Sequence, residues 1–126
     1  MPNRHILIID DEEDIREVAQ ASLELVAGWT ITTAKSGIEG LEKAVSEKPE
    51  AILLDLMMPD MDGWEVYQQM KADDKTKNIP VIVVTAKAQS IDKVLGLHIA
   101  KVDDYITKPF SPQDLMNSVE KVLKSK

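Results

Sequence analysis

The chain has 126 residues and no cysteine, and its 22 acidic and 15 basic residues give a formal net charge of −7. This length suits one domain, and the lack of cysteine excludes disulfides, thiolate catalysis and zinc–sulfur sites. The acidic excess argues against direct binding of nucleic acid, and no apolar run reaches the about 20 residues that span a bilayer. Because residues 1–5 are also too short and polar for a signal peptide, we expect a soluble, cytoplasmic protein without membrane contact.

The first half of the chain alternates strand and helix patterns. Residues 5–9 (HILII) form a continuous apolar run, which predicts a strand buried on both faces. Apolar residues then recur at helical spacing over 15–26, and Gly28 ends that helix. Residues 29–34 (WTITTA) are β-branched and alternating, as in a strand. The sequence SGIE at 36–39 is typical of a capping box and predicts the start of a second helix.

The same alternation continues through the second half. Apolar runs predict two further strands, at residues 51–54 and 80–85, and residues 104–107 (DYIT) are predicted as a short fifth strand. Helical spacing and start signals predict a helix after each of them, over 62–72, over 90–99 and from Ser111 onwards. Ser111 provides the cap of the last helix, and Pro112 occupies its first position.

Five strand–helix units in succession define the fold class. Continuous apolar strands between helices predict an α/β fold with a parallel sheet that is covered on both faces. In such sheets ligands bind beyond the carboxyl ends of the strands, near the point where the strand order reverses. The polar residues at the strand ends are therefore the candidate site.

Three carboxylates, a hydroxyl and an ammonium follow the predicted strands. Asp10 and Asp11 come after the first strand, Asp55 after the third, Thr85 at the end of the fourth and Lys108 after the fifth. Crowded carboxylates repel one another unless a cation neutralises them, and Mg²⁺ is the divalent ion that suits oxygen ligands.

This set of side chains is also suited to phosphoryl transfer. An ionised aspartate beside the metal can act as a nucleophile and form an aspartyl phosphate. Lys108 would pair with a phosphoryl oxygen, and the Thr85 hydroxyl would contact another. Phosphoryl transfer needs little beyond such positioning and charge stabilisation.

Four motifs in order resemble those of response-regulator receiver domains, which act in two-component signalling and chemotaxis. The motifs are ILIIDDEEDIR, AILLDLMMPDMDGWE, PVIVVTAKA and DDYITKPF, and the resemblance covers essentially the whole chain. It implies a flavodoxin-like (βα)5 fold with a five-stranded parallel sheet in the order 2-1-3-4-5. It also implies a single receiver domain over residues 1–126. The sequence stops after the last helix without an output domain, so it is either a stand-alone regulator or a receiver cut from a larger protein, and we expect the former.

The resemblance assigns a role to each site residue. Asp55 would accept the phosphoryl group, while Asp10, Asp11, Asp55 and the backbone carbonyl of Met57 would hold Mg²⁺, directly or through water. Thr85 and Lys108 would respond to the phosphorylated state, and Tyr105 would be an aromatic switch that turns inward with Thr85. The Lys108–Pro109 peptide bond is cis in the family. Lys101-Val102 replaces the usual Gly-Ala pair, which affects the choice of partner.

The implied function is a phosphorylation-controlled switch rather than an enzyme. The phosphoryl donor would be a sensor histidine kinase or a phosphotransfer protein, and catalysis would be limited to self-phosphorylation and autodephosphorylation. A downstream protein would bind the surface made by the helix at 90–99, the strand at 104–107 and the last helix. A homodimer that forms on phosphorylation through this surface is left open.

Three other functions are compatible with parts of this pattern. Haloacid-dehalogenase-type phosphatases also use a nucleophilic aspartate with Mg²⁺, but they carry a second aspartate as general acid where this chain has Met57. A nucleotide- or flavin-binding module would need a glycine-rich loop after the first strand, where this chain has Asp10-Asp11-Glu12-Glu13. An inert receiver scaffold would lack one of the acids or the lysine.

Purely structural interpretations of the same residues are also available. Asp11 with Asp14 reads as a helix cap, and the run from Glu12 to Asp14 reads as a solvated face that favours the positive end of the helix. Asp60 and Asp62 before Gly63 do not fit a calcium-binding loop, so they are interpreted as turn residues and the cap of the following helix. Without the resemblance, Tyr105 would be a core aromatic residue with a solvated hydroxyl.

Overall fold

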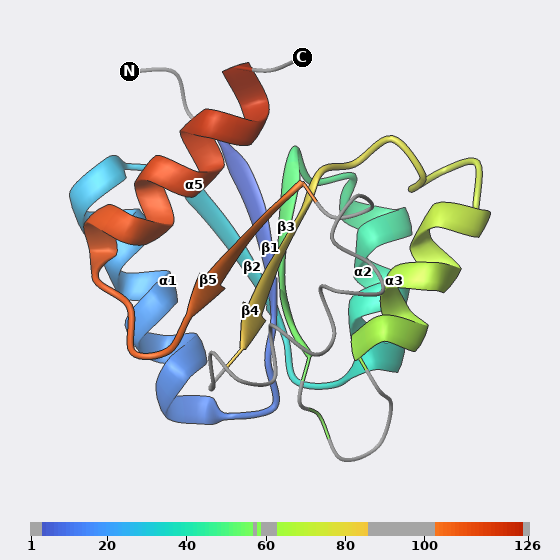
Figure 1. The fold of residues 1–126 in the computed structure, drawn as a ribbon, viewed down its shortest axis with the longest axis horizontal. Helices are drawn as coiled ribbons and strands as arrows, with labels where there is room; N and C mark the ends of the chain where they lie inside the picture. Colours follow the sequence, from blue (N-terminus) through green and yellow to red (C-terminus); the bar gives the residue numbers. More distant parts are fainter. Residues whose placement is uncertain (1–3, 57, 59–62, 86–102, 125–126) are drawn as a thin grey trace.

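The structure is a computed structural model, and it describes residues 4–56, 58, 63–85 and 103–124. Five strands within these residues form one parallel sheet in the order β2-β1-β3-β4-β5 (Figure 1). They are β1 (His5–Ile9), β2 (Thr30–Ala34), β3 (Ala51–Asp55), β4 (Val81–Thr85) and β5 (Asp104–Thr107). The predicted α/β class, parallel sheet and strand order are confirmed.

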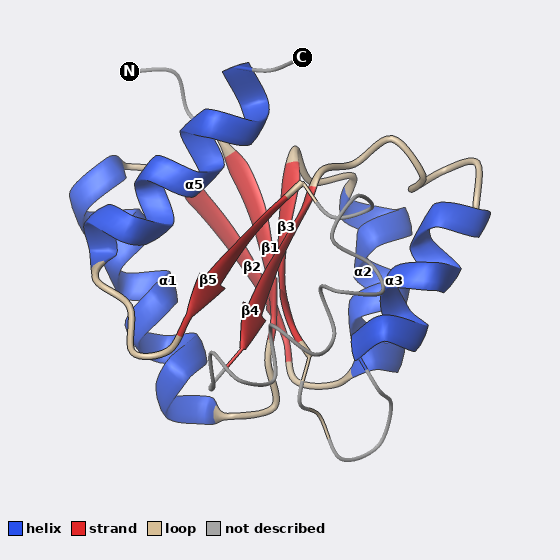
Figure 2. Ribbon diagram, in the orientation of Figure 1, coloured by secondary structure: helices blue, strands red, loops and turns tan. Residues whose placement is uncertain are grey.

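Helices cover both faces of the sheet, as predicted. In Figure 2, α1 (Glu13–Ala27) and α5 (Pro112–Lys124) lie on one side of the strands, and α2 (Gly37–Glu47) and α3 (Gly63–Ala72) lie on the other. The helix predicted over 90–99 falls within residues 86–102, which are outside the described part of the chain. The described elements therefore form three layers with the sheet in the middle.

The continuous apolar character of the central strands follows from this arrangement. Successive side chains of a strand point to opposite faces, and in β1 both faces are covered. Ile6 and Ile8 pack in a buried cluster with α1 and α5, whereas Leu7 and Ile9 pack in a second cluster with α2 and α3. A strand in this position has no solvent-facing side, so the alternation of apolar and polar residues is absent.

The helix ends follow the predicted signals, with one exception. Gly28 adopts the left-handed conformation (φ 72°), and its N–H donates to the carbonyl of Glu24, which ends α1. Ser36 Oγ accepts the Glu39 N–H at 3.1 Å at the start of α2. By contrast, the N-cap of α1 is Glu12 and makes no side-chain capping bond. The interpretation of Asp11 as a helix cap is therefore wrong.

The register of the strands brings the candidate residues to one edge of the sheet. Ile9 of β1 is paired with Leu54 of β3, so the chain continues into Asp10 on one strand and Asp55 on its neighbour. Thr85 of β4 is paired with Thr107 of β5, directly before Lys108. These positions lie at the carboxyl ends of four strands, on both sides of the β1–β3 reversal point.

Candidate functional site

Four carboxylates converge at this edge. Asp10, Asp11, Glu12 and Asp55 each offer one oxygen, and these oxygens all lie within 4.8 Å of one another. Asp10 and Asp55 are buried, with 3% and 2% of their surface exposed, while Glu12 is exposed to solvent. Buried carboxylates at this spacing require positive charge to remain ionised together.

The ammonium of Lys108 supplies part of that charge. Its Nζ lies 2.9 Å from Asp10 Oδ2, 3.2 Å from Glu12 Oε1 and 3.6 Å from Asp55 Oδ2. Burial alone would lower the pKa of the lysine, but the hydrogen bond with Asp10 and the charges of Asp10 and Asp55 outweigh it and raise the pKa above its usual value. Lys108 therefore stays protonated and carries a positive charge in the site.

Backbone contacts hold the first strand end in place. Asp10 Oδ1 accepts the Glu12 N–H at 2.9 Å, and Asp10 O accepts a bond of 2.7 Å from Arg16 Nη1. These contacts leave Asp10 Oδ2 to face Lys108. The turn between β1 and α1 therefore fixes both the carboxylate and the main chain of Asp10.

A close backbone approach holds the second strand end. The Gly63 N–H at the start of α3 donates to Leu56 O at 3.2 Å. A Cβ at this glycine would lie 2.5 Å from Leu56 Cα and 2.6 Å from Asp55 O. The first residue of α3 thus packs directly on the backbone that carries Asp55, which a larger residue would displace.

The residues of the cluster fit a hard divalent cation. All four donors are carboxylate oxygens, the ligand type that Mg²⁺ prefers. Asp11 Oδ1 is buried, and none of the described residues offers it a hydrogen-bond partner, which is costly for a carboxylate oxygen unless a cation compensates it. One lysine also cannot neutralise four carboxylates. The pocket therefore has both the ligands and the excess negative charge for a second cation.

The structure brings together Asp10, Asp11, Asp55 and Lys108 of the predicted set. Thr85 ends β4 at the same edge, and the structure does not describe its side chain. Met57 lies outside the described residues, as do Asp60 and Asp62. The Lys108–Pro109 peptide bond is cis, as the resemblance implied.

Sequence reasoning missed the part that Glu12 plays in the site. The run from Glu12 to Asp14 was interpreted as a solvated face, but Glu12 Oε1 contacts Lys108 at 3.2 Å. Its position directly after Asp10-Asp11 was a usable signal, because the residue before a helix at the carboxyl end of a strand faces the same edge.

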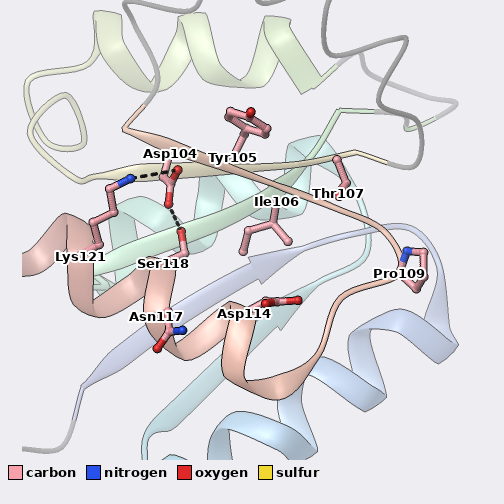
Figure 3. Close-up of a pocket in the computed structure, with 9 residues that line it drawn as sticks. All are labelled: Asp104, Tyr105, Ile106, Thr107, Pro109, Asp114, Asn117, Ser118 and Lys121. Carbon is pink, nitrogen blue, oxygen red and sulfur yellow. Dashed lines mark hydrogen bonds and ion pairs between the residues drawn. The ribbon is translucent and has the colours of Figure 1, made fainter.

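A groove between β5 and α5 lies on another face of the domain. It measures about 350 Å³, and Figure 3 shows Asp104 and Ile106 on the side of β5 that faces α5, with Tyr105 on the other side. The Tyr105 side chain is 46% exposed. Asp104 Oδ2 accepts a bond of 2.6 Å from Ser118 Oγ, and Lys121 Nζ lies 3.8 Å from Asp104 Oδ1 (Figure 3). Asp104 is thus engaged within the chain.

Taken together, fold and site define a class of protein. It is a doubly wound α/β domain whose strand-order reversal carries buried carboxylates and a lysine, with more carboxylates than the lysine neutralises. Such a site binds and stabilises phosphoryl groups through charge and positioning.

The chain belongs to the response regulator receiver domain family, whose model matches residues 6–120. It is 43% identical over 122 residues to the alkaline phosphatase synthesis transcriptional regulatory protein PhoP of Bacillus subtilis, covering 97% of this chain and 49% of that protein. It is 41% identical over 124 residues to the phosphate regulon transcriptional regulatory protein PhoB of Pseudomonas aeruginosa, covering 98% and 53%. The chain thus spans about half the length of these relatives.

Solved structures show the same fold over whole chains. The chemotaxis protein CheY4 of Vibrio cholerae matches with a TM-score of 0.85 and 28% identity, covering 97% of this chain and 100% of that one. A CheY-like receiver domain of Methanospirillum hungatei matches with a TM-score of 0.85 and 31% identity, covering 98% and 96%. Among the described residues, no helix has the length and apolar character to cross a bilayer.

Proposed function

We propose that Asp55 is the phosphoryl acceptor of this receiver domain and that its phosphorylation switches a protein-binding face. The observation that carries the proposal is the position of Asp55. It is buried at the end of β3, shares a cluster of oxygens with Asp10 and Asp11, and lies 3.6 Å from Lys108. Membership of the receiver family supports the same role for this strand end.

The proposed reaction transfers a phosphoryl group from a phosphohistidine. A carboxylate oxygen of Asp55 attacks phosphorus, a new O–P bond forms, the N–P bond of the donor breaks, and the departing imidazole keeps the electron pair and takes up a proton. Lys108 stabilises negative charge on a phosphoryl oxygen, and the Thr85 hydroxyl donates to another. Asp10, Asp11 and Asp55, with the carbonyl of Met57, would hold Mg²⁺, which when bound offsets the charge of the carboxylates and the phosphoryl group.

The first prediction concerns the acceptor. Asp55→Asn removes the nucleophilic carboxylate with little change of shape, so it should abolish labelling by acetyl phosphate and Mg²⁺. Intact-mass spectrometry should show one added phosphoryl group in the wild type and in the control Asp114→Asn, which changes a carboxylate at the start of α5. Circular dichroism checks that each variant is folded. Undiminished, acid-stable labelling of Asp55→Asn would refute the assignment.

The partners of the switch follow from the family. We propose that a sensor histidine kinase or a phosphotransfer protein donates the phosphoryl group. The downstream target is a protein that binds the surface of β5 and α5. The names of PhoP and PhoB describe transcriptional regulatory proteins, which supports a target in gene control. The phosphorylation-dependent homodimer stays a prediction.

The second prediction concerns the face of β5 and α5. If Tyr105 responds to the site, beryllofluoride with Mg²⁺, as a mimic of the phosphoryl group, should shift the NMR signals of the Tyr105 ring and of amides near Ser118. The reason is that Lys108 comes directly after the last residue of β5. A movement of Lys108 at the site should therefore shift this strand. Signals of Thr30 and Ile31, at the end of β2 that lies away from the site, should move less and provide the control. Unchanged Tyr105 signals in a protein that binds beryllofluoride would contradict the switch role.

A further inference from the structure

Lys108 already occupies the acidic cluster as its resident cation. Its side chain is 10% exposed, and its shortest ion pair is with the buried Asp10. The proposed metal needs the same Asp10 carboxylate. Two cations on one carboxylate repel each other, so metal binding requires the ammonium to move away from Asp10 at least in part.

A lysine that leaves a buried partner needs another carboxylate. An ammonium displaced within a largely buried pocket loses hydrogen bonds that water cannot fully replace. Glu12 is suited to receive it, because Glu12 Oε1 is already 3.2 Å from Lys108 Nζ and the Glu12 side chain is 57% exposed. Its main chain is fixed by the N–H bond to Asp10, so the side chain alone has to adjust.

We propose that Glu12 is a positioning residue that holds Lys108 when a divalent cation takes Asp10. This inference rests on the proposed metal site and adds to it a role for an acidic residue outside the family's ligand set. Glu12 keeps the ammonium at the mouth of the pocket, beside Asp55 and available to an arriving phosphoryl oxygen. Metal binding then becomes an exchange of cations in which no charge is left without a partner.

The neighbouring acids do not share this position. Within the described residues, neither Glu13 nor Asp14 forms an ion pair with Lys108, although both lie in the first turn of α1 and carry the same charge. Both are exposed, so their effect on the pocket is screened by solvent and salt. Glu13→Gln is therefore a matched control, since it removes one charge next to Glu12 without removing the lysine contact.

The test measures the affinity for Mg²⁺ alone by calorimetry. We expect Glu12→Gln to weaken Mg²⁺ binding by about three- to tenfold and Glu13→Gln by less than about twofold. The same substitution is then made in a Lys108→Met background. Because Glu12 acts through the lysine, Glu12→Gln should there have no more effect than Glu13→Gln.

A second measurement does not depend on the folding of the lysine variant. In wild-type protein with isotope-labelled lysine, the Lys108 ammonium should remain slow to exchange after Mg²⁺ saturation, because Glu12 accepts its hydrogen bond. In Glu12→Ala, which offers no side-chain acceptor, it should exchange rapidly under the same conditions. Equal exchange in the two proteins overturns the proposal.

The outcomes separate this inference from the proposed function. Equal affinities for Glu12→Gln and Glu13→Gln overturn the role of Glu12 while leaving the metal site intact. An effect of Glu12→Gln that persists in Lys108→Met makes Glu12 a direct contributor to the metal and overturns the exchange. Wild-type protein that takes up no Mg²⁺ overturns the metal site and the exchange together, whereas failure of Asp55 labelling alone affects only the acceptor.

Discussion

At the scale of single residues, Gly63 has a structural role that its helix-start position does not reveal. A Cβ at Gly63 would meet backbone atoms of Asp55 and Leu56, which cannot rotate away as a side chain can. At Gly40 a Cβ would meet the ends of the Ile9 side chain at 2.5 and 2.8 Å. Both glycines lie in helices, so mutation to alanine raises helix propensity at both positions. A difference in stability between the two variants therefore reports the contacts of the added Cβ.

Gly63→Ala should therefore destabilise the domain more than Gly40→Ala. Forcing the backbone of β3 and α3 apart costs about 1–3 kcal/mol, while at Gly40 only one side chain has to shift, although Ile9 is buried and β-branched. Urea denaturation measures both free energies of unfolding. Gly63→Ala should also slow the labelling of Asp55 in the fraction that stays folded. Equal stabilities of the two variants would show that the contact with Asp55 and Leu56 relaxes freely.

The sequence alone predicted those site residues that lie at the carboxyl ends of strands. Asp10 and Asp55 directly follow apolar runs and Lys108 follows the short strand at 104–107, and parallel strands bring such residues to one edge whatever the details of packing. The position of Glu12 directly after Asp10-Asp11 indicated this edge of the sheet, but its contact with Lys108 was hidden, because that contact depends on where a lysine distant in sequence lies. The close approach at Gly63 was equally hidden, since it requires the separation between α3 and β3.

At the scale of secondary-structure elements, α5 has a complete capping box. Ser111 Oγ accepts the Asp114 N–H at 3.1 Å, and Asp114 Oδ2 accepts the Ser111 N–H at 3.0 Å. The helix then buries Leu115, Val119 and Val122 against the sheet. The cap thus fixes the start of the helix that forms one wall of the groove in Figure 3.

Ser111→Ala should lower the free energy of unfolding by about 1 kcal/mol. The substitution leaves the Asp114 N–H without its side-chain acceptor at the helix start. Gln113→Ala is the control, because Gln113 is exposed in the same turn and bonds only to the exposed Asn117 at 2.8 Å among the described residues. Thermal and urea unfolding would reveal the difference. Equal losses in the two variants would mean that the box contributes nothing beyond local helix propensity.

The described elements were largely predictable, because apolar runs and cap signatures are local signals. Deviations occur at boundaries: Trp29 precedes β2 and is buried in the core, and Pro80 precedes β4. Neither is surprising, since a large apolar residue packs as well beside a strand as in it, and proline cannot donate to a ladder. The order of the strands came from the family resemblance, because periodicity does not say which strands are neighbours.

At the scale of the whole molecule, Arg4 connects the two ends of the described chain. Its guanidinium donates two bonds to Glu120 of α5, at 3.2 and 3.1 Å, and lies 3.5 Å from Glu50. The hydrogen bond with Glu120 raises the pKa of Arg4 above its usual value, so the positive charge is permanent. A two-bond arginine–carboxylate pair is the geometry in which a surface ion pair contributes measurably.

A double-mutant cycle with Arg4→Met and Glu120→Gln should give a coupling energy of about 1 kcal/mol in urea unfolding. The pair Lys77–Asp74 is the control, because it has a similar distance of 3.1 Å but side chains that are 48% and 92% exposed. Its coupling should be close to zero, since solvent screens both charges. A coupling at Arg4–Glu120 no larger than that of the control would remove the pair from the account of stability.

The joining of first and last elements also determines when this domain can fold during synthesis. The cluster beneath α1 combines Ile6, Ala19 and Leu23 with Leu115, Val119 and Val122, so its two halves are separated by most of the chain. Before α5 is made, the inner side of α1 can pack on residues of the sheet such as Ile6, but the α5 part of the cluster is missing and Arg4 has no Glu120 to pair with. This cluster can therefore reach its native packing only after α5 has left the exit tunnel.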